Sequence, residues 1–63
     1  MGQFTGTSTK IQEALDMAVV KAGEALLTGE GVFSFVVTTI NGKGTSGFAG
    51  FTTEVTVTID AAL

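Results

Sequence analysis

The arrangement of apolar and polar residues predicts one helix in the first half of the chain. Between residues 10 and 28 an apolar set recurs at spacings of four and three, with Leu26 beside it: Ile11, Leu15, Ala18, Ala22 and Ala25. This period predicts an amphipathic α-helix with one apolar stripe. Alanine dominates the stripe, so the helix can lie close to its neighbour. Met17 and Val20 fall outside the stripe and indicate a second buried contact.

Signals at both ends support these helix bounds. Thr9 and Gln12 have the spacing of a capping box, in which side chains bond to backbone amides that a helix leaves unpaired. Gly29 occupies the position expected for a C-terminal cap. Before the helix, residues 3–8 predict a short extended segment, which Gly6 is expected to break.

Residues 32–40 predict a strand, because this run is β-branched or aromatic almost throughout. One face would carry Phe33, Phe35, Val37 and Thr39. The other face would carry Val32, Ser34, Val36, Thr38 and Ile40. Both faces are substantially apolar, so we expect both to be covered.

Residues 51–60 predict a second long strand, in which the alternation is strict. One face would carry Thr53, Val55, Val57 and Ile59. The other would carry Thr52, Glu54, Thr56, Thr58 and Asp60. The threonines on this second face would form a ladder of hydroxyl groups, which suits contact with water or with another subunit.

The segment between these strands, residues 41–50, contains four glycines. The dipeptide Asn41-Gly42 is a strong signal for a hairpin turn. The remaining loop is then long, unless the strands extend beyond the positions given above. Two arrangements stay open: the strands run on past the turn, or a mobile glycine-rich loop projects from the sheet.

These elements predict a single α+β domain over residues 1–63, with the order β-α-β-β. The two long strands would form an antiparallel hairpin within a three-stranded antiparallel sheet that wraps one helix. The helix would cover one face of the sheet, and no element of the chain remains for the other face. A second copy of the chain would have to cover it.

The small size of the chain also favours self-association. A chain of 63 residues rarely gains more than about 3–5 kcal/mol of net stability from its core. Cysteine is absent, so disulfides cannot add to this. Charged residues make up only 14% of the chain, against roughly 25% in typical soluble domains. A homo-oligomer is therefore expected.

Composition excludes several functions. The chain has neither cysteine nor histidine, which removes thiol and imidazole catalysis and the usual zinc ligands. Its net charge is −3 and it has no arginine, so binding to nucleic acid is not expected. No apolar run is long enough to span a membrane, and no signal peptide is evident at the start. We therefore expect a cytoplasmic protein without a membrane partner.

Two further patterns in the sequence could indicate a binding or catalytic site. Residues 42–47 match G-x-G-x-x-G, but a strand follows instead of the helix that a phosphate cradle needs, so a flexible loop is favoured.

The six carboxylates show no catalytic pairing: Glu13, Asp16, Glu24, Glu30, Glu54 and Asp60. Glu54 or Asp60 from several copies could bind calcium or magnesium. No nucleophile lies beside a base, so no enzyme activity, no catalytic residue and no metal site within one chain are predicted.

Three local strings, in this order and spacing, resemble the dodecin family. They are Gly6-Thr7-Ser8 before the helix, the alanine-rich helix itself, and Phe51 to Val57 (FTTEVTV) in the last strand. The similarity covers nearly the whole chain. It implies a three-stranded antiparallel sheet wrapped on one helix. It also implies twelve copies in a hollow sphere that stores flavin in aromatic-lined pockets between subunits, without turning over a substrate.

The resemblance also implies a candidate ligand site. The family stacks flavin on a tryptophan at the start of the second strand, where this chain has Val32 followed by Phe33. A glutamine of the third strand usually contacts the flavin ring, and Thr52 is the best match here. The stacking tryptophan is thus not retained, and each missing stack removes about 0.5–1.5 kcal/mol. Phe48 and Phe51 are further aromatic residues expected at an interface or pocket.

The sequence therefore predicts a non-enzymatic subunit of a closed homo-oligomer, a dodecamer by resemblance. Its predicted role is to bind or store a small molecule similar to flavin, with FMN or riboflavin as the cofactor and Val32, Phe33 and Thr52 at the site. The alternative is a structural or divalent-cation-binding oligomer that has the same fold and no flavin site.

Overall fold

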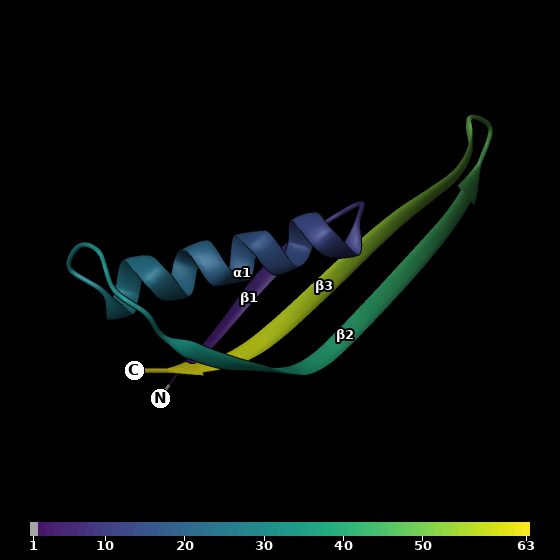
Figure 1. The fold of residues 1–63 in the computed structure, drawn as a ribbon. Helices are drawn as coiled ribbons and strands as arrows, with labels where there is room; N and C mark the ends of the chain where they lie inside the picture. Colours follow the sequence, from purple (N-terminus) through teal and green to yellow (C-terminus); the bar gives the residue numbers. More distant parts are fainter. Residues whose placement is uncertain (1) are drawn as a thin grey trace.

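One helix and three strands make up the fold, as the sequence predicts. The computed structural model describes residues 2–63, in which β1 (Gly2–Ser8), α1 (Ile11–Leu26), β2 (Ser34–Gly47) and β3 (Gly50–Ala62) follow one another. The strands form one antiparallel sheet in the order β1-β3-β2. α1 lies across one face of this sheet (Figure 1). The predicted α+β fold with β-α-β-β order is confirmed.

The core lies between α1 and the central strand β3. Residues on one face of each element are buried: Ala14, Ala18 and Ala22 of α1, and Val55, Val57, Ile59 and Ala61 of β3. The strict alternation predicted for β3 is therefore confirmed. The helix stripe is rotated from its predicted position, because Ala14 is buried whereas Ile11 and Ala25 are exposed.

The ends of α1 differ from the predicted caps. The N-terminal cap position is Lys10, which makes no side-chain capping bond, so the predicted capping box of Thr9 and Gln12 is wrong. Gln12 Nε2 instead donates to Asp16 Oδ1 at 3.1 Å, one turn along the helix. The helix ends at Leu26 and its cap residue, Leu27, is extended. The predicted glycine cap is therefore also wrong.

β1 continues through Gly6 without the predicted break. Gly6 is buried and faces α1. Its missing side chain lets the helix backbone lie directly against the strand, and the glycine therefore serves packing here.

The hairpin turn lies seven residues after the position predicted from Asn41-Gly42. Both of these residues pair with β3, and the chain reverses at Phe48 and Ala49, between the paired residues Gly47 and Gly50. Gly50 takes a φ of +104°, a value that favours glycine. With the turn at this position, the backbone groups of residues 43–47 find strand partners in residues 50–54. The strands therefore run on, and the alternative of a long loop is wrong.

A β-bulge changes which residues of β2 share a face. Val37 lies opposite Ile59 and Thr39 lies opposite Thr58, so Thr38 is an extra residue in β2. Residues directly opposite one another in an antiparallel pair point to the same face. The predicted alternation therefore fails after the bulge, and Ile40, opposite Val57, joins the helix side of the sheet.

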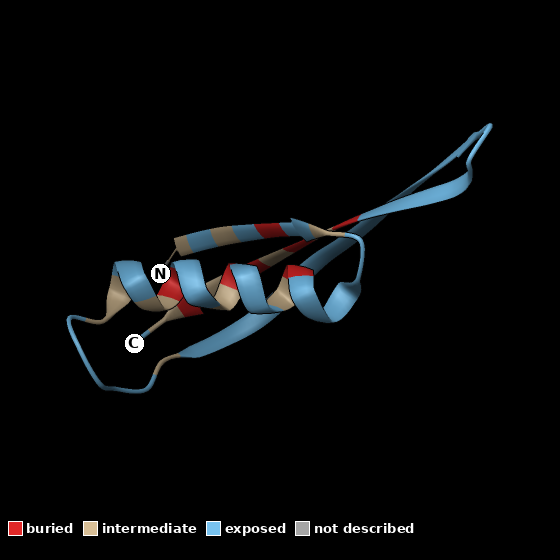
Figure 2. Ribbon diagram, turned by 90° about the horizontal axis from the view of Figure 1, so that it is seen from above, coloured by how far each residue is buried: buried red, intermediate tan, exposed pale blue. Residues whose placement is uncertain are grey.

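The β2–β3 hairpin extends well beyond the core. The last residue pair between β1 and β3 joins Ser8 to Val55, and residues 43–54 form a two-stranded projection that we call the hairpin arm. The molecule measures 46 × 20 × 13 Å, and its Cα radius of gyration is 13.7 Å, against about 11 Å for a compact domain of this length. The arm is exposed over its whole length, while buried residues cluster near α1 (Figure 2).

Within residues 2–63, α1 does not combine the length and the apolar character needed to cross a bilayer.

Candidate functional site

The helix leaves strand β2 uncovered. Among residues 2–63, α1 packs against β1 and β3, whereas no Cα atom of α1 lies within 8 Å of a Cα atom of β2. Every residue of β2 is exposed. The predicted cover on both faces of this strand is therefore absent from the single chain.

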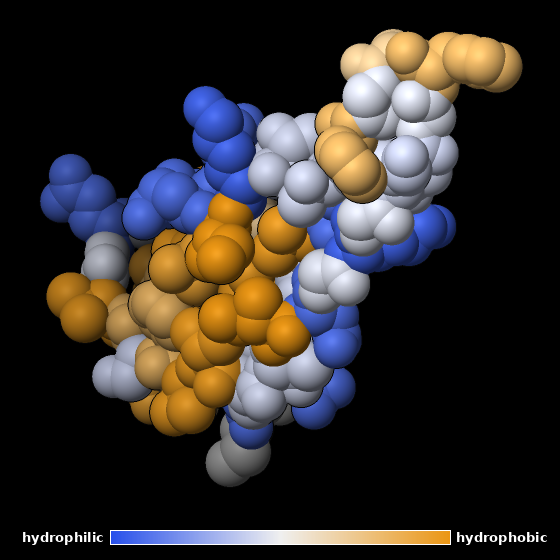
Figure 3. Space-filling view, turned by 90° about the vertical axis from the view of Figure 1, so that its right-hand side faces the viewer, coloured by the Kyte–Doolittle hydropathy of each residue, from blue (hydrophilic) through white to orange (hydrophobic). Residues whose placement is uncertain are grey.

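The uncovered strand presents apolar side chains on the helix side of the sheet. Phe35, Val37 and Ile40 lie opposite the buried residues Ala61, Ile59 and Val57, and therefore point to the same face as them. Leu15 and Val19 of α1 pack partly against the core beside them. We call these five residues the open apolar surface: Leu15, Val19, Phe35, Val37 and Ile40. Figure 3 shows apolar side chains gathered in one patch on this side of the helix.

The other flank of α1 faces β1, which fixes the orientation of the helix. Lys21 Nζ donates a hydrogen bond to the Thr5 carbonyl oxygen at 2.7 Å, and the Met17 Cβ lies against Gly6. The helix thus leans toward β1. Its apolar flank on the opposite side, with Leu15 and Val19, is left beside the uncovered strand.

The sheet face away from the helix is mostly polar, contrary to the expectation of an apolar face there. Threonine hydroxyls pair across β1 and β3 on this face: Thr5 with Thr58 at 3.4 Å and Thr7 with Thr56 at 3.2 Å. This confirms the predicted threonine face, and its hydroxyls bond to one another. The apolar surface that lacks cover therefore lies beside the helix, on the same side of the sheet.

The predicted ligand residues lie in two separate places. Val32, in the segment that precedes β2, is 87% exposed. Phe33 is half-buried, and its ring centroid lies 6.4 Å from that of Phe35, with the two planes tilted by 46°. Thr52 lies in the hairpin arm, and its Oγ1 donates a hydrogen bond of 3.5 Å to the Thr45 carbonyl oxygen.

The register shows how far apart these places are. Ser34, which follows Phe33, pairs with Ala62, whereas Thr52 pairs with Thr45. Ten residues of strand separate Thr52 from Ala62, which is about 33 Å. One chain does not bring Thr52 beside Val32, and a pocket lined by both requires a second copy.

A depression of about 230 Å³ lies near the start of β2. It is lined by Ser34, Phe35, Val36, Asp60 and Ala62. Its volume is below the roughly 300–1,000 Å³ of typical ligand sites. Phe35 belongs to both this depression and the open apolar surface. Sequence reasoning placed Phe35 on the same strand face as Phe33 but did not include it in the predicted site.

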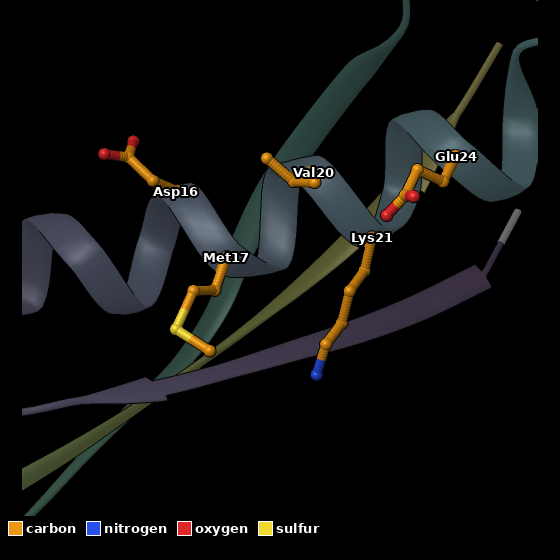
Figure 4. A pocket seen from close by; sticks show the side chains of 5 residues that line it. All are labelled: Asp16, Met17, Val20, Lys21 and Glu24. Atoms are coloured by element: carbon orange, nitrogen blue, oxygen red, sulfur yellow. The ribbon is translucent and has the colours of Figure 1, made fainter.

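A second depression, of about 360 Å³, lies on the outer face of α1. It is lined by Asp16, Met17, Val20, Lys21 and Glu24 (Figure 4). Met17 and Lys21 point toward β1, and Asp16 and Val20 point away from the sheet. All five residues come from one helix, so no second element encloses a ligand there. Met17 and Val20 remain exposed, so the burial predicted for them is not seen among residues 2–63, although the Met17 Cβ lies against Gly6.

In the part of the chain that the structure describes, no three acidic residues lie close enough to hold a metal ion. Glu54 lies at the base of the hairpin arm opposite Lys43, and Asp60 lies in the depression near Ser34. A cation site that uses either carboxylate would need several copies. Residues 42–47, the G-x-G-x-x-G match, form part of β2 and pair with β3, which corrects the expected flexible loop.

No family model, curated protein or solved structure matches this chain.

Proposed function

We propose that this protein is a non-enzymatic subunit of a closed homo-oligomer that binds or stores a planar small molecule similar to flavin. The open apolar surface is the single observation that carries the proposal. The chain covers this surface only in part, since Leu15 and Val19 are half-buried while Phe35, Val37 and Ile40 remain exposed. A second copy of the same chain is the partner always present at equal concentration.

The amount of exposed surface supports association. The chain exposes 4486 Å², whereas a folded monomer of 6.4 kDa exposes about 3,800 Å². The excess is about 700 Å², close to the roughly 800 Å² that each partner buries in a standard protein interface. Association of copies would bring this molecule to an ordinary ratio of surface to mass.

The aromatic pair at the start of β2 supports a planar ligand. Phe33 and Phe35 lie within stacking range of one another, and Val32 beside them is exposed. The depression that includes Phe35 is too small and too open to enclose a ligand in one copy. A pocket completed between copies is the arrangement that the resemblance to dodecins implies, and twelve is the copy number it implies. A cytoplasmic location belongs to the same proposal.

The assembly is tested first, by multi-angle light scattering of the purified chain. The expected mass is a defined multiple of 6.4 kDa that persists on dilution. A well-folded monomer in dilute buffer would contradict the proposal.

Ligand binding is tested second, by titration of riboflavin or FMN into the assembled protein. Quenching of flavin fluorescence that saturates at a fixed ratio per subunit is expected. An assembled protein that leaves flavin fluorescence unchanged, and whose melting temperature rises with calcium, would instead favour the structural or cation-binding alternative.

A further inference from the structure

We infer that the hairpin arm of one copy docks onto the open apolar surface of a second copy. This inference rests on the proposed function for the existence of an assembly, and it adds the two surfaces that meet. The arm and the open apolar surface lie on different parts of the molecule, so a contact between them would join two copies.

The tip of the arm is unusually apolar for a projecting segment. Phe48 is fully exposed and Phe51 is 85% exposed. Residues 44–53 carry no charge, and the nearest charged side chains, Lys43 and Glu54, lie opposite each other at the base of the arm. Natural proteins usually protect projecting strands with charges or proline, and residues 44–53 of the arm have neither.

The area that these two rings would bury in an interface is a large part of the surface that the chain exposes in excess of a compact monomer. A phenylalanine buries roughly 150–250 Å² when it is covered. Phe48 and Phe51 together account for about 300–500 Å² on this basis. This is a large part of the excess of about 700 Å² that the chain exposes over a compact monomer of its mass.

The dimensions of the arm fit the open apolar surface. From Val55 to the turn at Gly50 the arm spans about 17 Å of strand. The 16 residues of α1, which bound the surface on one side, span about 24 Å. The arm consists mostly of glycine, serine, threonine and alanine apart from its two rings, so it can lie flat beside a helix.

The chain cannot satisfy this contact on its own. The arm is the continuation of β2, which itself forms the floor of the open apolar surface. The arm leads away from α1 (Figure 1), and bringing it back over β2 would require that strand to reverse on itself. Each copy therefore gives one arm and receives one. Two copies that exchange arms form a two-fold symmetric pair, whereas a head-to-tail arrangement of the same contact closes into a ring.

A double substitution at the arm tip tests the contact. Phe48→Ser with Phe51→Ser removes both rings from positions where they support nothing within the chain, so the fold should be retained. We expect the assembled species to be lost, with an unchanged far-ultraviolet circular dichroism spectrum. The matched control is Leu63→Ser, which alters another residue that is 79% exposed and should leave the assembly intact. A double variant that assembles like the unmodified chain would overturn the inference.

Directed crosslinking tests the pairing of the two surfaces, and the absence of natural cysteine makes it specific. A Phe51→Cys chain mixed with an Ile40→Cys chain should form a disulfide-linked heterodimer under mild oxidation. The control is a mixture of the Phe51→Cys chain with a Val20→Cys chain, whose cysteine lies on the outer face of α1. This mixture should form little disulfide-linked heterodimer. Equal yields from the two mixtures would overturn the inference.

The outcomes separate this inference from the proposed function. If the unmodified chain is assembled and the arm variant stays assembled, the inference fails and the proposed assembly stands. If the unmodified chain is a monomer, the proposed function and this inference both fail. Co-sedimentation of that monomer with phosphatidylcholine vesicles, lost in the arm variant, would then show that the arm serves a membrane.

Discussion

Gly6 of β1 lies against Ala18 of α1 so closely that a Cβ atom on Gly6 would stand 2.8 Å from the Ala18 backbone nitrogen. The same atom would stand 2.9 Å from the Met17 Cβ. Both neighbours belong to the backbone or the first side-chain atom of a regular helix, so neither can move aside without displacing the helix. The distance between α1 and β1 is therefore set by the absence of a side chain at Gly6.

Gly6→Ala is expected to lower the free energy of unfolding by about 3 kcal/mol or more, at the upper end of the cost of overpacking. This approaches the whole stability of a domain of this size. Urea denaturation at a fixed protein concentration measures the loss. Gly44→Ala is the control, since nothing lies within 4 Å of a Cβ at that strand position. Equal stability of the two variants would contradict the packing described for β1.

Ala22 is a buried residue of the predicted helix stripe, and Ala25 is an exposed one. Ala22→Glu places an unpaired charge in the core and should lower the free energy of unfolding by more than about 4 kcal/mol. Ala25→Glu introduces the same side chain at an exposed position and should change stability by less than about 0.5 kcal/mol. Thermal unfolding followed by circular dichroism measures both. Similar melting temperatures for the two variants would show that the helix is rotated differently.

The hairpin turn depends on Gly50. A side chain at its φ of +104° is strained, so Gly50→Ala should cost about 1–3 kcal/mol. The effect should be concentrated in the arm, where amide hydrogen exchange should accelerate. Gly47→Ala, on the other side of the turn, has open space for a Cβ and no positive φ, and should leave exchange rates unchanged. Faster exchange in the second variant alone would place the turn elsewhere.

Val32 tests the ligand part of the proposed function. Val32→Trp places an indole at an exposed position beside Phe33, and should raise the affinity of the assembled protein for riboflavin by about two- to tenfold, as stacking of about 0.5–1.5 kcal/mol allows. Fluorescence titration measures this change. Leu63→Trp adds the same ring at another exposed site and should have no effect. An equal gain from both variants, or no gain from either, counts against a pocket at Val32.

Several features followed from local patterns alone. The buried face of β3 was predictable because Val55, Val57 and Ile59 alternate with polar residues, and only one register buries them. The helix was predictable from its apolar period. Its exact bounds were not, because caps depend on side-chain bonds that compete with others: Gln12 bonds to Asp16 in place of a capping partner.

Features of the candidate site were harder to predict because they depend on pairing between distant residues. The turn at Phe48 is favoured because it pairs residues 43–47 with residues 50–54 of β3, and a strong local signal at Asn41 is overridden. The extra residue Thr38 moved Ile40 to the helix side of the sheet, and nothing in the sequence marks this bulge. Thr52, chosen by resemblance, lies far along the hairpin from Val32.

The sequence by itself determined the order of the elements, the buried face of β3 and the shortage of polar surface, because each of these follows from residues close together in the chain. The tertiary structure decided that α1 covers β1 and β3 and leaves β2 open. That choice depends on how closely the helix can approach Gly6, a contact between residues of two elements that no local pattern specifies.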